Sequence, residues 1–262
     1  MEKTVQNFQE FVEIVKRLRK ECPWDSVQTH ESLKHLMIEE VYEAVESIDN
    51  HNLMELKKEL GDILLHVVLH SVMAEETNSF TLSDVLDAIS KKLIVRHPHI
   101  FGDEKVDGIK NVLQNWEALK MKEGRTSILE GVPKNLPALL QAYRIQDKVS
   151  SVGFDWKNKE DVWKKVVEEI EEFSPHRHEP SEKALDELGD ILFSLTNYAR
   201  HIGLNPEEAL MKTNRKFIKR FQFVEGKMKE ENLDWKNTSL EQMDLFWNEA
   251  KRGGLERGDM EK

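Results

Sequence analysis

Cysteine, glycine and proline are scarce in this chain, and each shortage excludes a class of fold. The one cysteine, Cys22, cannot form an internal disulfide, which excludes a disulfide-stabilised scaffold and fits a reducing compartment. Only 12 glycines and 7 prolines occur among 262 residues, whereas Leu, Glu, Lys and Ala are prominent. This usage is typical of helices, so we expect an all-α protein without strands.

Positive charge and long apolar runs are also lacking. The formal net charge is -11, which argues against a nucleic-acid groove because phosphate tracking requires an excess of Lys and Arg. The longest apolar stretch, Ile63 to Ala74, is interrupted by His66 and His70 and is too short to span a bilayer. The first twenty residues are charged throughout and contain no signal peptide. We therefore expect a cytoplasmic protein with no nucleic-acid partner and no membrane association.

The most informative pattern is an acidic motif that occurs twice. In each copy Glu-Glu-x-x-Glu is followed, after about fifteen residues, by Glu-Leu-Gly-Asp. The candidate metal ligands are Glu40, Glu43, Glu59 and Asp62 in the first copy and Glu169, Glu172, Glu187 and Asp190 in the second. Acids three residues apart share one face of a helix, so two packed helices of this kind bring four carboxylates together. The group repels itself unless a hard cation binds within it, which predicts Mg²⁺, or Mn²⁺ in its place.

Other landmarks repeat in the same order around the acids. A helical apolar pattern leads to Pro23-Trp24-Asp25 in the first copy and to Phe154-Asp155-Trp156 in the second. Each copy then ends in Trp-x-x-x-Lys, first as Trp116 with Lys120 and again as Trp247 with Lys251. Repetition of a whole series of landmarks indicates one duplicated helical domain.

The segment between the copies has a different composition. Residues 122–137 contain two glycines and two prolines, which favour turns and predict a linker. We therefore expect an N-terminal domain over residues 1–121 and a C-terminal domain over residues 138–262, each long enough to bury a core.

With these features the chain resembles the two-domain form of the MazG family of nucleoside triphosphate pyrophosphohydrolases. The motifs that carry the resemblance, besides the duplicated acids, are Cys22-Pro23-Trp24-Asp25, Arg96-His97-Pro98-His99-Ile100-Phe101-Gly102 and Val152-Gly153-Phe154-Asp155-Trp156. The resemblance implies an all-α fold of tandem MazG-type domains, with about four helices each, assembled as a homodimer. It also implies Mg²⁺-dependent cleavage of nucleoside triphosphates between the α and β phosphates, which gives NMP and pyrophosphate and would serve nucleotide-pool house-cleaning.

The same resemblance, read with the local spacing, assigns the other site residues to the second copy. The candidate substrate-binding residues are Lys165, Lys183, Lys216, Arg220, Trp247 and Lys251. Lys216 and Arg220 are spaced i, i+4, so both can face one phosphate chain, and Trp247 can stack on a base of any identity. Glu168 or Glu169 is the candidate catalytic residue, because a carboxylate there can orient or deprotonate the attacking water.

The two copies differ in the cations beside their acids. Where the second copy has Lys165 and Lys183, the first has Leu36 and Glu55. A triphosphate needs cations in addition to the metal, so we expect the second copy to be the principal catalytic site. The first copy is then a weaker, differently selective or mainly structural site.

Two other functions compete with hydrolysis. A carboxylate-bridged di-iron protein also uses four acids in a helical bundle, but it requires Glu-x-x-His pairs where this chain has Glu-x-x-Asp. A non-enzymatic helical interaction module would leave the paired acids and the basic clamp without a role. A zinc site at His97-Pro98-His99 or His176-Arg177-His178 is disfavoured, because these histidines lie in loop-like sequence without a helical ligand pair.

Overall fold

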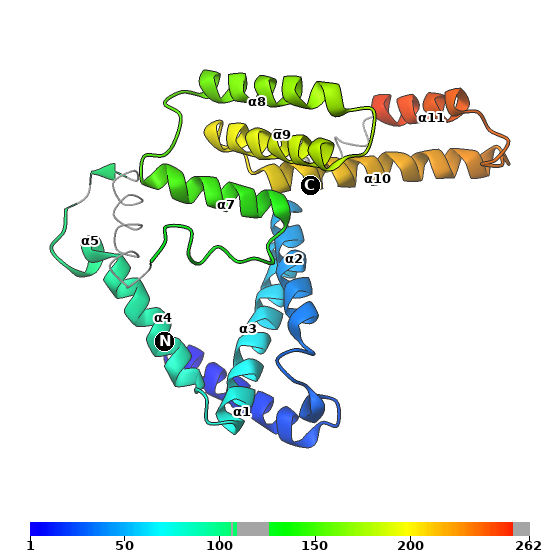
Figure 1. Ribbon diagram of the computed structural model, residues 1–262. Coiled ribbons are helices and arrows are strands. Elements are labelled where there is room, and N and C mark those ends of the chain that lie inside the picture. The colour runs from blue at the N-terminus through cyan, green and yellow to red at the C-terminus, as the bar shows by residue number, and fades with distance from the viewer. Residues whose placement is uncertain (106, 109–125, 254–262) are drawn as a thin grey trace. The chain divides into compact units, whose positions relative to one another are not determined.

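The computed structural model describes residues 1–105, 107–108 and 126–253, and these form helices and connecting turns without a strand (Figure 1). The predicted all-α class is therefore confirmed. The chain divides into two compact units, Met1–Glu104 and Lys105–Lys262. Trp116, Lys120 and the first part of the predicted linker lie outside the described residues, and the domain boundaries at 121 and 138 stay predictions.

The first unit is built around a hairpin of two helices. Its elements are α1 (Glu2–Glu21), η1 (Asp25–Val27), α2 (Lys34–Asp49), α3 (Leu53–Glu76), α4 (Leu82–Arg96) and α5 (Pro98–Phe101). The turn between α2 and α3 contains His51 in a left-handed conformation, with φ of 53°, and Asn52 then caps α3 by accepting a hydrogen bond from the Glu55 amide. This tight connection packs α2 against α3 along their lengths.

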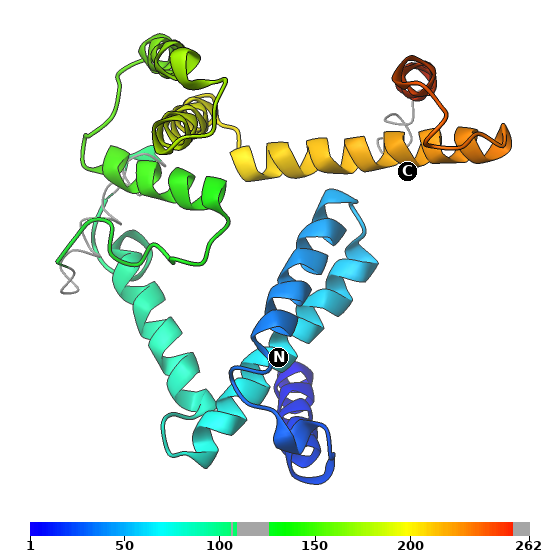
Figure 2. The same ribbon diagram turned by 45° about the vertical axis from the view of Figure 1, so that its right-hand side comes forward.

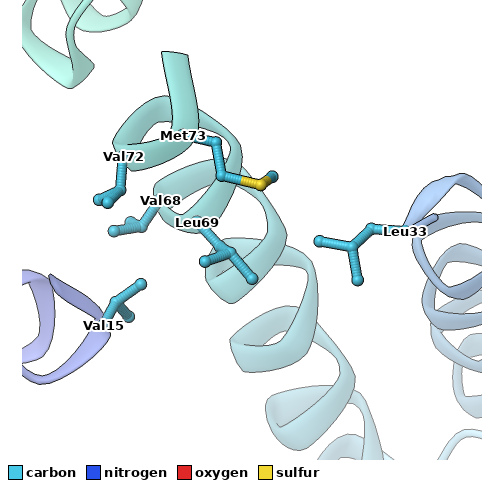
Figure 3. Packing of buried hydrophobic residues seen from close by; sticks show 6 residues of the cluster. All are labelled: Val15, Leu33, Val68, Leu69, Val72 and Met73. Carbon is cyan, nitrogen blue, oxygen red and sulfur yellow. The ribbon is translucent and has the colours of Figure 1, made fainter. Parts of the chain in front are cut away.

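The core of the first unit lies between α1, α3 and the residue that precedes α2. Val15, Leu33 and four apolar residues of α3 are buried, and Figure 3 shows their side chains converging. The four residues of α3 are Val68, Leu69, Val72 and Met73. Their spacing places them on one side of the helix, and the acids Glu59 and Asp62 lie earlier on α3, nearer the hairpin turn. A packed helix therefore carries two of the four predicted acids of this copy.

The second unit contains the same kind of hairpin. Its elements are α7 (Ala138–Ser151), α8 (Lys159–Phe173), η2 (Ser174–His176), α9 (Glu182–His201), α10 (Pro206–Glu230) and α11 (Leu240–Arg252). Helix α8 packs against α9, and α7 packs on α9, as Figure 1 shows. Asn158 and Ser181 cap α8 and α9 through hydrogen bonds from the Asp161 and Ala184 amides. The duplicated acidic motif thus corresponds to a duplicated helical hairpin.

Helix α10 begins beside α7 and α9 and then continues beyond them (Figure 2). Its distal part packs on α11, where Val224, Met228 and Phe246 form a second buried cluster. None of the described helices combines the length with the apolar character that a membrane crossing requires.

Candidate functional site

Three of the four predicted acids of the second copy lie together. Glu169 on α8, and Glu187 and Asp190 on α9, each offer a carboxylate oxygen within 4.8 Å of the other two. The residues Glu169 and Glu187 are buried, with 6% and 5% of their surface exposed, whereas Asp190 is exposed. Glu172 is exposed one turn along α8. The pKa of Lys183 is raised chiefly by its bond to Glu187 and least by the charge of Glu172, so Glu172 also lies near this group. The α8–α9 hairpin therefore gathers the predicted ligands at one place.

Two lysines neutralise these buried acids. The Lys165 ammonium lies 2.7 Å from a carboxylate oxygen of Glu168 and 2.7 Å from one of Glu169, and Lys183 forms an ion pair with Glu187. Hydrogen bonding to Glu168, and then to Glu169, raises the pKa of Lys165 above its ordinary value. The bond to Glu187 likewise raises the pKa of Lys183. Both predicted lysines are thus held at the acids as charged groups.

The first copy brings its acids together in the same way. Glu40 and Glu43 on α2 and Glu59 on α3 offer carboxylate oxygens within 4.8 Å of one another. Burial, followed by the charge of Asp62, raises the pKa of Glu40, so Asp62 lies close to this group. Burial and the charge of Glu43 raise the pKa of Glu59. All four predicted acids of the first copy therefore act on one another.

The surroundings of this first acidic group differ from those of the second. A cavity of about 240 Å³ beside it is lined by Glu43, Glu46, Ser47, Asn50, Asn52, Glu55 and Glu59, which are acidic or neutral. Lys58 lies nearby, but its ammonium bonds Glu55 at 2.7 Å. The two copies thus differ in the cations at their acids. Lys165 and Lys183 bond candidate metal ligands of the second copy, whereas Lys58 of the first copy bonds Glu55, which is not one of the candidate ligands.

A cavity of about 300 Å³ lies next to the second acidic group, between α7, α8 and α9. It is lined by Ile145, Gln146, Val149, Phe154, Asp155, Trp156, Val162, Lys165, Glu169, Asp190, Phe193, Ser194, Asn197 and Arg200. The lining therefore combines two acids of the group and one of its lysines with an apolar and aromatic surface. A site of this composition can hold a ligand that is charged in one part and apolar in another.

One rim of this cavity is fixed by a partly buried ion pair. Asp155 accepts hydrogen bonds of 2.7 Å at both carboxylate oxygens from Arg200 and approaches the His201 ring at 2.8 Å. Burial by itself would raise the pKa of Asp155, but the bonds from Arg200 and His201 outweigh burial and leave that pKa below its ordinary value. The charged Asp155 thereby fastens the segment of Phe154 and Trp156 to α9.

The remaining predicted substrate residues lie on α10 and α11. The Arg220 guanidinium lies 5.6 Å from the centroid of the Trp247 ring, and the Phe217 ring lies 5.0 Å from it. Lys216 and Lys251 are exposed on the same two helices. None of the four predicted residues lines the cavity at the acids, because α10 leaves the α7–α9 group (Figure 2). A single chain thus brings Arg220 to Trp247 but not to the acids, and their role in binding stays a prediction.

Sequence reasoning missed the polar residues of the cavity wall. Gln146 and Asn197 are buried, with 4% and 5% of their surface exposed, and both line the cavity. A signal for Gln146 was present in the sequence, because it lies four residues after Ala142 and three before Val149, on the expected core face of the helix. A polar residue at a core position is a candidate for a specific contact.

Comparison with known proteins identifies the family of this chain. The MazG nucleotide pyrophosphohydrolase domain matches residues 28–101. The chain is 42% identical over 251 residues to the nucleoside triphosphate pyrophosphohydrolase/pyrophosphatase MazG of Thermotoga maritima, across 94% of this chain and 96% of that protein. It is 39% identical over 249 residues to the nucleoside triphosphate pyrophosphohydrolase of Escherichia coli K12, across 91% and 95%.

A third relative is longer. The uncharacterized protein YabN of Bacillus subtilis is 48% identical over 255 residues, which cover 93% of this chain and 51% of that protein. The similarities to the Thermotoga and Escherichia proteins extend over nearly the whole of both chains. The resemblance inferred from the motifs is therefore confirmed, and the chain belongs to the MazG nucleotide pyrophosphohydrolase family.

Proposed function

We propose that this protein hydrolyses nucleoside triphosphates to NMP and pyrophosphate in a Mg²⁺-dependent reaction, chiefly at the second acidic group. The observation that carries the proposal is the convergence of Glu169, Glu187 and Asp190 within 4.8 Å, with Lys165 bonded to Glu169 at the edge of a cavity. Family membership and the activities for which two relatives are named support the same chemistry.

The donor set of the second group fits a hard divalent cation. Glu169, Glu187 and Asp190 present oxygen atoms only, and Mg²⁺ takes oxygen ligands and commonly keeps several waters. When bound, Mg²⁺ supplies positive charge to the triphosphate and lowers the pKa of a coordinated water. A di-iron centre is less suitable, because each Glu-x-x-Asp pair lacks the histidine that such centres require.

The lysines have a role that their positions support. Lys165 and Lys183 bond the acids that would hold the cation, so a bound cation competes with them for the same carboxylates. Released from the acids, an ammonium group one helical turn away can bond phosphate oxygens and stabilise the charge that develops on the leaving pyrophosphate. Glu168 accepts a hydrogen bond from the Lys165 ammonium and so lies beside the second acidic group. From there its carboxylate can orient the attacking water.

Product analysis tests the bond that is cleaved. Hydrolysis in H₂¹⁸O should release NMP and pyrophosphate as the first products, with ¹⁸O in NMP if water attacks the α phosphorus or in pyrophosphate if it attacks the β phosphorus. Mass spectrometry of the products measures both. Release of NDP and orthophosphate as the primary products would overturn the proposed chemistry.

Apolar side chains on the hairpin surfaces support assembly as a homodimer. Leu188, Leu192 and Leu195 on α9 are exposed, as are Val167 and Ile170 on α8. Their spacing forms apolar stripes on two neighbouring helices, and an uncovered stripe of this kind typically marks a protein interface. A second copy would cover these surfaces and would supply another α10 with its basic residues.

Solution mass tests this assembly. Light scattering coupled to size exclusion should give twice the chain mass of 30.7 kDa. Replacement Leu192→Glu places a charge in the stripe and should shift the species to the single-chain mass, because burial of an unpaired charge is costly. Leu245, which is exposed on α11, provides the control Leu245→Glu. A wild-type protein with the single-chain mass at micromolar concentration would contradict the dimer.

A further inference from the structure

The cavity between α7, α8 and α9 has the size of a pocket for one ring system. Its volume of about 300 Å³ is at the lower limit of typical ligand pockets, roughly 300–1,000 Å³. Ile145, Val149, Val162 and Phe193 supply an apolar wall. A planar heterocycle would therefore fit this wall better than a string of phosphates, which requires charged partners along its length.

Two exposed aromatic side chains stand at the same cavity. Phe154 and Trp156 line it, with 79% and 44% of their surface exposed. The faces of such rings are suitable for stacking on a base of any identity. The clamp of Asp155 by Arg200 holds the backbone between them, so the two rings are presented from a fixed segment.

The cavity also contains a buried hydrogen-bond acceptor without a partner among the described residues. The Gln146 amide nitrogen donates to the Phe193 carbonyl at 2.8 Å. A carbonyl can only accept, so this bond fixes the orientation of the amide and leaves Gln146 Oε1 as the other atom. That oxygen is buried and has no hydrogen-bond partner in this part of the chain, while Gln146 lines the cavity. A buried unpaired acceptor is costly, which points to a ligand that donates to it.

We propose that this cavity binds the nucleobase of the substrate and that Gln146 Oε1 accepts a hydrogen bond from an N–H group of the base. The inference rests on the proposed triphosphate hydrolysis, because Lys165, Glu169 and Asp190 line the same cavity and would receive the phosphates. Every common base carries an N–H donor, as an amino group or as a ring imide. Gln146 therefore distinguishes bases that have an N–H donor from analogues that lack one. In this arrangement the base does not contact Trp247 of the same chain.

Pairs of substrates that differ in one amino group test this contact. ATP is compared with purine riboside triphosphate, and CTP with its pyrimidin-2-one analogue, by measuring pyrophosphate release. Wild-type kcat/KM should be about 10- to 100-fold higher for the amino-bearing member, because the analogue leaves a buried acceptor unpaired. Equal kcat/KM for both members of each pair would overturn the proposal, and this measurement requires no variant.

The variant Gln146→Met adds a second test. This variant keeps the length of the side chain and removes the acceptor. The ratio of kcat/KM between the amino-bearing substrate and its analogue should therefore fall to about one, while kcat/KM for the analogues should change little. Gln141→Met is the matched control, since Gln141 lies on the same helix and its amide donates to the Pro133 carbonyl. A ratio unchanged in Gln146→Met would also overturn the proposal. Absence of pyrophosphate from every triphosphate would instead mean that the proposed hydrolysis is wrong.

Discussion

Replacement Asp190→Asn should remove nearly all triphosphate hydrolysis. We expect kcat to fall by about 10³-fold or more. Asp190 is the exposed member of the second acidic group and lines the cavity beside Glu169. The amide keeps the shape of the side chain but removes one negative ligand from a group that is proposed to hold Mg²⁺. Steady-state pyrophosphate release measures the loss, and chelation of divalent ions should cause a loss of similar size in the wild type.

Matched variants distinguish this effect from a change in folding. Asp62 occupies the equivalent place in the first copy, and Asp62→Asn should retain the greater part of the activity if the second copy is the principal site. Glu160 lies on α8 and is exposed, so Glu160→Gln serves as a surface control. Equal losses in Asp190→Asn and Asp62→Asn, with both proteins folded, would mean that the first copy is a catalytic site in its own right.

A second large effect is expected from Lys183→Glu, which gives the second copy the residue that the first copy has at Glu55. Lys183 pairs with the buried Glu187 in the structure. The replacement removes a cation that is proposed to bind phosphate and adds repulsion beside the acids. We expect kcat/KM to fall by about 10²-fold, mostly through weaker triphosphate binding. Initial rates over a range of triphosphate concentration separate KM from kcat.

The reciprocal change provides the control for this argument. Glu55→Lys introduces a lysine beside the first acidic group, where Lys58 already pairs with Glu55. We expect it to preserve the wild-type rate or to add hydrolysis from the first copy. If Lys183→Glu kept wild-type kcat/KM at moderate ionic strength, the lysines would not explain the difference between the copies. High salt should reduce the effect of Lys183→Glu, because its side chain is 61% exposed and therefore screened.

Much of the fold follows from local features of the sequence. Helix-favouring composition, apolar residues at helical spacing and turn signals depend on neighbours within a few residues, so they could be read without a structure. The pairing of Glu169 with Glu187 was also within reach, because two helices joined by a short connection pack as a hairpin. The asymmetry of Lys183 and Glu55 followed from aligning the two copies by their acids.

The sequence by itself determined the all-α class, the duplicated hairpin and the carboxylates that meet within it. Tertiary structure alone decided that Gln146 lines a cavity at the acids and that Asp155 is clamped by Arg200. It also decided that α10 extends beyond the α7–α9 group (Figure 2) and that Arg220 does not line this cavity. The sequence could determine the first set of features because helical periodicity fixes which side chains share a face of one helix. The position of one helix against another depends on packing between residues far apart in the sequence, which no local pattern records.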